Sequence, residues 1–169
     1  MVLEGTFSDE FGDFGAGTYV RTLPQSAHSP HSDGGCVVFV KHWQFDLSDR
    51  TAVTISTAKS FFVRDALHGG VGVMPLFEDE RETVHLERCD SLCEVTRDFP
   101  EGGELFVLEG SFTADDGEPM RRWSWLAAAA AEHRALRRRG RRKRVQSVAQ
   151  DAASALRRRA RQRVKCSKR

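Results

Sequence analysis

Histidine and cysteine are the side chains of this chain that are best able to hold a metal ion. There are six histidines and four cysteines. Cys89 and Cys93 do not have the spacing of a zinc knuckle, and no second pair accompanies them. Because no disulfide framework is visible either, we expect four free thiols. They are Cys36, Cys89, Cys93 and Cys166.

Two other kinds of chemistry find no support in the residue pattern. Gly34-Gly35 and Gly102-Gly103 are typical of turns, because neither pair lies between a strand and a helix as a phosphate-binding loop requires. The Ser, His and Asp residues show no arrangement that indicates a nucleophile with its base. The sequence thus gives no reason to expect a nucleotide-binding or hydrolytic enzyme.

Basic residues are concentrated near the end of the chain. Residues 137–144 read RRRGRRKR and residues 157–161 read RRRAR. Such runs can contact phosphates with an affinity that depends on salt and not on sequence. The region has no aromatic side chain on which bases could stack. Non-specific nucleic-acid binding through this segment is therefore one hypothesis for a function.

Charge divides the chain into an acidic body and a basic tail. Residues 1–126 hold 10 basic and 22 acidic residues, and residues 127–169 hold 16 and 2, out of 26 and 24 in all. Every Phe, Trp and Tyr lies before Ala127. Without aromatic residues to bury, the tail cannot build a core of its own.

Length and composition limit the class of protein. A chain of 169 residues with a mean hydropathy of −0.47 has room for one domain or two small ones. No apolar run is long enough to cross a membrane, and the first residues have no secretory signal. We therefore expect a cytoplasmic protein with no membrane partner.

The body is predicted to be almost entirely β-strand. Short runs rich in β-branched and aromatic residues alternate with clusters of Gly, Pro, Asp and Ser, which is typical of a barrel or sandwich. The Glu-Gly pairs and the following Gly residues should supply the positive φ angles of the turns. In the tail, alanine and a spacing of three or four residues between apolar side chains predict a helix over 145–164, after a break at Gly140.

An internal repeat runs through the body. VLEGTFS at residues 2–8 recurs as VLEGSFT at residues 107–113, and Gly12 recurs as Gly117. With one extra residue, GTYV at 17–20 aligns with WSWL at 123–126. A period of this length is the size of a small domain. The chain therefore reads as two related domains, each incomplete.

These motifs resemble the ChrR-like cupin family. The resemblance rests on residues 3–21, PQSAH at 24–28, GCVVFVK at 35–41, MPLFED at 74–79 and GGELFVLEG at 102–110. It implies an all-β fold, the double-stranded β-helix or jelly-roll barrel of tandem cupins. Residues 1–45 would be the second half of a first cupin repeat, and residues 46–126 the linker strands and the first half of a second. Residues 127–169 would be the basic tail.

The resemblance also implies a metal site, which would hold Zn or Fe. In this family two His and a Glu come from a first motif and one His from a second. His28 matches the second-motif His of the first repeat, and Glu104 matches the Glu of the second repeat. The H-x-H stretch of the second repeat reads Arg97-Asp98-Phe99, and alanines at 127–131 replace its second motif. The resemblance thus predicts a degenerate site with His28 and Glu104 as metal ligands.

A barrel assembled from both half-repeats could recruit further donors. His31, His42 and His85 are the candidates for a third ligand. Because truncated barrels expose strand edges, a homodimer that completes the barrel is a further expectation.

Three functions remain open at this stage. The first is a metal- or ligand-responsive binding module with a regulatory role, whose partner is a small molecule or a regulatory protein. The chain shows no match to the sigma-binding domain of ChrR anti-sigma factors. The second is a cupin dioxygenase that acts on a small diketone or aryl ketone with Fe(II). The third is nucleic-acid binding by the tail, unless residues from 127 onward are a non-homologous or out-of-frame extension.

Overall fold

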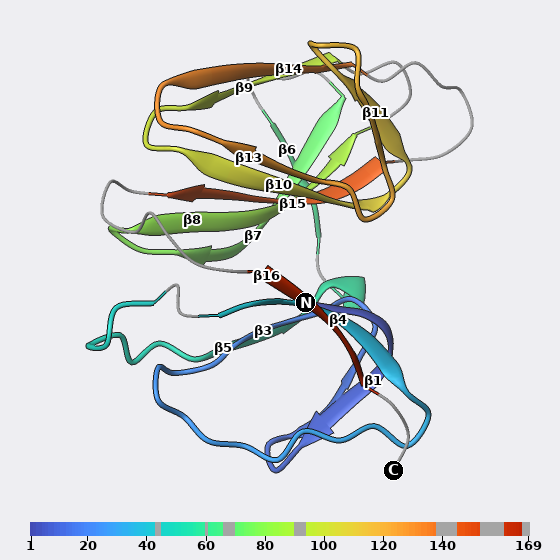
Figure 1. The fold of residues 1–169 in the computed structure, drawn as a ribbon, viewed down its shortest axis with the longest axis vertical. Coiled ribbons are helices and arrows are strands. Elements are labelled where there is room, and N and C mark those ends of the chain that lie inside the picture. Colours follow the sequence, from blue (N-terminus) through green and yellow to red (C-terminus); the bar gives the residue numbers. More distant parts are fainter. Residues whose placement is uncertain are drawn as a thin grey trace. The chain divides into compact units, whose positions relative to one another are not determined.

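Antiparallel strands dominate the chain in the computed structural model (Figure 1). The structure describes residues 1–42, 45–59, 61–65, 70–89, 94–137, 145–152 and 161–166. Two compact units are formed, unit 1 from residues 1–60 with 156–169, and unit 2 from residues 61–155. The part of the chain that is described contains no helix with the length and apolar character of a membrane span. The prediction of an all-β chain is confirmed.

Unit 1 consists of two antiparallel sheets. The larger has the order β16-β4-β1-β2, and β3 pairs with β5 in the smaller. The elements are β1 (Val2–Asp9), β2 (Gly12–Gly15), β3 (Thr18–Arg21), β4 (Cys36–Lys41), β5 (Val53–Ser56), the 3-10 turn η1 (Thr57–Lys59) and β16 (Arg161–Cys166). Val2, Cys36 and Val38 form the buried core, and Phe7 and Phe14 pack against it. Although β16 comes from the far end of the chain, it lies along β4 (Figure 1).

Unit 2 has a six-stranded sheet of order β13-β10-β15-β8-β7-β6 and a four-stranded sheet of order β12-β11-β14-β9. The first comprises β6 (Val63–Arg64), β7 (Val71–Glu78), β8 (Glu82–Cys89), β10 (Gly103–Glu109), β13 (Trp125–Ala128) and β15 (Val145–Ala152). The second comprises β9 (Glu94–Phe99), β11 (Ser111–Ala114), β12 (Pro119–Arg121) and β14 (Glu132–Arg137).

The core of unit 2 follows from the alternation of side chains along its strands. Leu105, Val107 and Cys89 are 0% exposed and belong to one hydrophobic cluster. Alternate residues of a strand share a face. The face of β8 that carries Cys89 therefore also carries His85 and Glu87, and these two polar residues point toward the same interior as the core.

The sequence repeat reappears as a repeat of backbone conformation. Gly5 and Gly110 hold the same place in the repeat and have φ angles of 70° and 82°. Gly12 and Gly117 have φ angles of 139° and 85°. The prediction that these glycines supply the positive φ angles of the turns is confirmed.

The repeat holds even where the residue type has changed. Gly17 and Trp123 correspond in the repeat, and their φ angles are 84° and 70°. Their N–H groups donate to the carbonyl oxygens of Val2 at 2.9 Å and Val107 at 2.6 Å, which also correspond. A tryptophan rarely adopts a positive φ. Tertiary contacts therefore impose this turn on Trp123.

The repeated backbone continues beyond Leu126. Gln25 and Ala131, which the same offset places in register, both have a φ of 61°. The boundary predicted at 126/127 marks the change of composition, whereas the repeated conformation runs on into β14. The division into 1–45, 46–126 and 127–169, and the non-homologous origin of the tail, stay predictions.

The tail contributes strands where a helix was predicted over 145–164. Val145–Ala152 is β15, which lies between β8 and β10, and Arg161–Cys166 is β16. Residues 153–160 lie outside the described residues. Alanine favours an isolated helix, but two flanking strands satisfy the backbone of β15 on both sides, and such tertiary pairing outweighs local propensity.

The pairing of β16 has a counterpart in unit 2. β4 lies between β1 and β16, and β15 lies between β10 and β8. β10 carries Val107, which corresponds to Val2 of β1, so β10 is the counterpart of β1. β16 therefore pairs with β4 in the way that β8 pairs with β15.

Gly5 offers a test of this fold. A Cβ atom at its φ of 70° would overlap the carbonyl oxygen of Gly35. We expect Gly5→Ala to lower the free energy of unfolding by about 2–5 kcal/mol, through backbone strain and steric overlap. Gly15, whose Cβ would have open space, is the control. Gly15→Ala should stay within about 0.5 kcal/mol in urea unfolding. Equal losses for both variants would contradict the close approach of β1 to Gly35.

Candidate functional site

His28 lies in the loop between β3 and β4, where a buried carboxylate holds its ring. Its Nδ1 atom is 2.9 Å from Oδ2 of Asp9. The Asp9 side chain is 2% exposed and that of His28 is 31% exposed. Asp9 is itself held by the N–H of Phe11, which donates to Oδ1 at 2.8 Å. A carboxylate on one ring nitrogen orients the other. Nε2 of His28 is therefore the ring nitrogen that does not contact Asp9.

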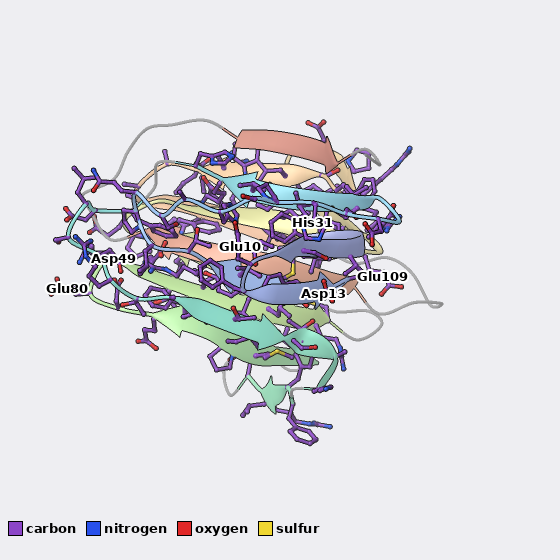
Figure 2. The ribbon with its side chains drawn as sticks, turned by 90° about the horizontal axis from the view of Figure 1, so that it is seen from below. Glu10, Asp13, His31, Asp49, Glu80 and Glu109 are labelled. Carbon is purple, nitrogen blue, oxygen red and sulfur yellow. The ribbon has the colours of Figure 1, made fainter. Side chains whose placement is uncertain are left out.

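Glu10 holds the residue after His28. Its carboxylate accepts the N–H of Ser29 at 2.9 Å and 3.0 Å (Glu10 is labelled in Figure 2). The Ser29 backbone hydrogen bond, with smaller help from Glu10's own backbone and the Ser29 hydroxyl, lowers the pKa of Glu10 below its usual value. The ionised form of Glu10 thus stabilises the loop that carries His28.

His31 and His42 are the other candidate ligands in unit 1. Among the described residues, no hydrogen bond joins either of them to His28. His31 is anchored through its backbone, which exchanges hydrogen bonds with Ser8 at 2.8 Å and 2.9 Å, and its side chain is exposed. His42 follows β4 and is also exposed.

The loop that carries His28 has a counterpart in unit 2. The bridge between Ser8 and His31 in unit 1 recurs as the pairing of Thr113 with Arg137. Thr113 is the counterpart of Ser8 in the repeat, and Arg137 is the counterpart of His31. The repeat therefore extends through β14.

Arg134 holds in unit 2 the place that His28 holds in unit 1. Each lies three residues before the bridged position. The carboxylate of Asp115 accepts a backbone hydrogen bond from Ala135, the residue after Arg134, just as Glu10 does from the residue after His28. An arginine has thus replaced the imidazole at this position of the second repeat.

Carboxylates surround Arg134. Its guanidinium pairs with Glu132, and Nη1 lies 3.4 Å from Asp115 and 3.9 Å from Asp116. Burial acts to lower the pKa of Arg134, but the charge of Glu132 and the hydrogen bond to Asp115 outweigh it and raise that pKa overall. The guanidinium is therefore a permanent cation.

A second polar cluster lies on the inward face of β8 and β9. Glu87 is 2% exposed, and its Oε1 lies 2.8 Å from Nε2 of His85. The Arg97 guanidinium pairs with the same oxygen, and its Nη1 lies 3.9 Å from Asp65. A buried carboxylate is costly unless it is paired with a cation. Arg97 supplies that cation inside unit 2.

The two arginines are direct cross-strand neighbours. Arg97 of β9 lies opposite Arg134 of β14 in the antiparallel register. Each is two residues from a buried apolar residue of its strand, Phe99 and Leu136, so both lie on the inward face. Opposed like charges are unfavourable in a sheet, and separate carboxylates neutralise each arginine here.

Glu104, the other predicted metal ligand, lies on β10 opposite Ala127 and Gln150. Because Leu105 belongs to the core, alternation places Glu104 on the other face of the strand. Glu104 belongs to unit 2 and His28 to unit 1. That they share a metal stays a prediction.

Residues 1–46 match the family model of the ChrR cupin-like domain. The match falls within unit 1 and includes His28 and Asp9. The strand content of the described residues confirms the predicted all-β class, and over residues 1–46 the family match agrees with the predicted cupin.

Solved structures of cupins are similar to this chain. A cupin superfamily protein from Desulfitobacterium hafniense is 16% identical over 53% of this chain and 83% of its own, with a TM-score of 0.45. In the Rhodobacter sphaeroides complex of SigE with the anti-sigma ChrR, the matched chain is 18% identical, over 52% of this chain and 46% of its own, with a TM-score of 0.44. An RmlC-like cupin from Shewanella frigidimarina is 13% identical over 68% and 92%, with a TM-score of 0.47. No curated protein matches the sequence.

The residues described do not assemble a complete cupin metal set. Among them, no three His, Cys, Asp or Glu side chains are grouped so that they could hold a metal ion. Unit 1 offers His28 as a single oriented donor. In unit 2, arginine stands at the place of His28.

Sequence reasoning found His28, His85 and the Arg97 segment but missed the roles of Glu87 and Arg134. Glu87 could have been noticed as a carboxylate at an inward position of a strand that ends at Cys89. Arg134 carried no such signal, because alanines at 127–131 hide the repeat and only the backbone restores it.

The ion pair inside unit 2 predicts a large stability effect. Arg97→Ala leaves Glu87 buried without its cation, and we expect the free energy of unfolding to fall by about 3–5 kcal/mol. Arg64, which is exposed on β6, is the control, and Arg64→Ala should stay within about 0.5 kcal/mol. Adding Glu87→Leu to Arg97→Ala should recover part of the loss in urea unfolding. No recovery in the double variant would show that the two charges are not coupled.

Glu10 predicts a pH effect in unit 1. Because folding lowers its pKa, its contribution to stability is present at neutral pH and is lost as the pH falls through the folded pKa. Glu10→Gln should therefore reduce stability at pH 7 and flatten the fall in stability at acid pH. Thermal melts from pH 7 down to pH 3 measure this, with Glu101→Gln at another exposed acid as the control. An unchanged acid limb in Glu10→Gln would refute the prediction.

Proposed function

We propose that this chain is a ChrR-like cupin binding module with a regulatory role and a degenerate metal site. The observation that carries the proposal is the ring of His28, which Asp9 holds at 2.9 Å through Nδ1. This arrangement directs Nε2 to a ligand, as in the second sphere of histidine metal sites.

His28 suits a ligand that approaches from solvent. Its side chain is partly exposed, while Asp9 beneath it is buried. The centroids of the Phe7 and His28 rings lie 6.0 Å apart, so Phe7 provides an apolar surface beside His28. A small molecule that has a hydrogen-bonding group and an apolar part fits these surroundings.

Zn or Fe is one ligand that the proposal includes. His28 would contribute Nε2, and a bound ion would supply a Lewis acid with open coordination positions. Asp9 would keep the proton on Nδ1 and hold the ring in place. Further donors would come from elsewhere, with Glu104 as the predicted second ligand and a second copy of the chain as another source.

A regulatory protein is the macromolecular partner that we propose. The support is the match of residues 1–46 to the ChrR cupin-like domain. A cupin dioxygenase and nucleic-acid binding by the tail stay predictions. The two basic runs fall largely within residues 138–144 and 153–160, outside the described residues.

Metal content tests the proposal. We expect the gel-filtered full chain to hold Zn and Fe far below one equivalent. Added Zn²⁺ should bind weakly at Nε2 of His28, which ¹H–¹⁵N NMR of the imidazoles detects. His28→Ala should abolish this response, and Asp9→Asn should weaken the affinity by about 10- to 100-fold.

The matched control is His31→Ala, because His31 is an exposed histidine of the same loop. It should leave the zinc response of His28 unchanged. Near-stoichiometric metal that disappears in His28→Ala would show a complete site and direct attention to oxygenase assays. A zinc response that survives in His28→Ala would refute the role of His28.

A further inference from the structure

We propose that Cys36 and Cys166 form a reversible disulfide, which fastens the edge strand β16 to unit 1 when a small-molecule disulfide oxidises the chain. The two cysteines lie directly opposite each other in the antiparallel register of β4 and β16 (Figure 1 shows the two strands). The proposal does not involve His28, so it goes beyond the proposed function and does not depend on it.

The backbone register brings the two residues within reach of a disulfide. In an antiparallel pair, directly opposed Cα atoms are about 4.5 or 5.5 Å apart, according to whether the two residues exchange hydrogen bonds. Cysteines joined by a disulfide have Cα atoms about 4.4–6.8 Å apart. Both kinds of opposed position fall within that range, and directly opposed residues share a face of the sheet. The bond therefore requires no change in the register of β4 and β16.

The cross-strand row that contains Cys36 has room for a disulfide. On the other side of β4, the residue opposite Cys36 is Gly5 of β1. Glycine has no side chain, so the row across the three strands consists of one glycine and two cysteines. A disulfide in this row meets no competing side chain from β1.

The other buried cysteine of the described residues shows what is particular about Cys36. Cys36 is a free thiol and is 5% exposed, while Cys89 is 0% exposed. Cys89 lies opposite Val71 of β7 and Val145 of β15, so neither of its cross-strand neighbours is a cysteine. Cys36 therefore differs from Cys89 in having a second thiol directly across from it.

The position of β16 explains how an oxidant reaches a buried thiol. β16 is the last strand of the order β16-β4-β1-β2 and pairs with β4 on one side. Strands at the edge of a sheet open at a lower free energy than central strands. Opening of β16 uncovers β4 and gives a small molecule access to both cysteines, and docking of β16 brings the cysteines together again.

The oxidant is a low-molecular-weight disulfide, RSSR, and the reaction is a thiol–disulfide exchange. The thiolate of Cys166 attacks one sulfur of RSSR, which forms a mixed disulfide and releases RS⁻. The thiolate of Cys36 then attacks Sγ of Cys166, forms the Cys36–Cys166 bond and releases a second RS⁻. The protons lost by the two cysteines convert both RS⁻ ions to RSH. The two protein thiols are thus oxidised by two electrons while RSSR is reduced to two RSH, and an excess of RSH reverses the reaction.

The experiment uses the full chain, reduced and then gel-filtered. It is incubated with mixtures of reduced and oxidised glutathione, the remaining thiols are blocked, and tryptic fragments are analysed by mass spectrometry without reduction. We expect the main link within a single chain to join residues 22–41 to residues 166–168. In concentrated urea this link should decrease at least about tenfold, because an unfolded chain closes the short loop from Cys89 to Cys93 more readily than the long one.

One control tests the register directly. Lys165→Cys in a Cys166→Ser background moves the thiol by one residue, opposite Val37. A shift of one residue places the side chain on the other face of the strand, so the link to Cys36 should decrease at least about tenfold.

Cys89→Ala is the matched control for loss of a buried thiol, and it should leave the link between Cys36 and Cys166 unchanged. Oxidised wild-type chain should also melt at a higher temperature than reduced chain, because the disulfide restricts the unfolded state. Cys166→Ser should remove that difference in melting temperature.

Each outcome decides the proposal. A Cys36–Cys166 link that forms within one chain, requires the folded state and is lost when the thiol moves to position 165 supports it. Cysteines that stay reduced or carry only glutathione, a link found only between two chains, or equal linkage from position 165 overturns it. None of these results depends on whether His28 binds zinc, so the two proposals can fail separately.

Discussion

The pairing of Glu87 with Arg97 inside unit 2 is the interaction on which that unit depends. The carboxylate is almost fully buried, and it holds together His85 of its own strand, Arg97 of the other sheet and, through Arg97, Asp65 at the edge. An unpaired charge in this position would cost several kcal/mol, so the strands that carry these residues must stay in register.

Unit 1 also buries two carboxylates, and each of them is paired with a basic side chain. Asp9 is paired with His28, and Asp49 is paired with Arg21 at the end of β3. Nη1 of Arg21 also donates to the carbonyl oxygen of Thr51 at 2.6 Å, so the pair fixes the loop before β5. One of these carboxylates is held by a permanent guanidinium and the other by Nδ1 of an imidazole, whose Nε2 does not contact that carboxylate. A guanidinium has no lone pair to donate, whereas a neutral imidazole has one on its second nitrogen.

Comparison of the two units shows that the repeat preserves conformation while its chemistry changes. Trp123 takes the left-handed conformation of Gly17, and Ala131 takes that of Gln25. The hydrogen bonds that set these turns connect backbone groups, so they tolerate different side chains. The residue inside the turn is under no such restraint. His28 and Arg134 therefore share a position and differ in chemistry, one an imidazole and the other a guanidinium with a fixed charge.

Much of the fold could be predicted from the sequence because it depends on local patterns. The strand-rich body, the repeat and the turn glycines such as Gly5 follow from residue types and spacing, whereas His28 is singled out by the resemblance to the cupin family. Pairings between distant strands could not be predicted. Alanine-rich residues 145–152 read as helix because their local propensity is helical, and only the backbone groups of β8 and β10 make them a strand. Likewise Arg97 reads as a missing histidine in the sequence. Its role as a counter-charge is decided by the burial of Glu87 on a neighbouring strand, because electrostatic cost depends on what the folded chain removes from water.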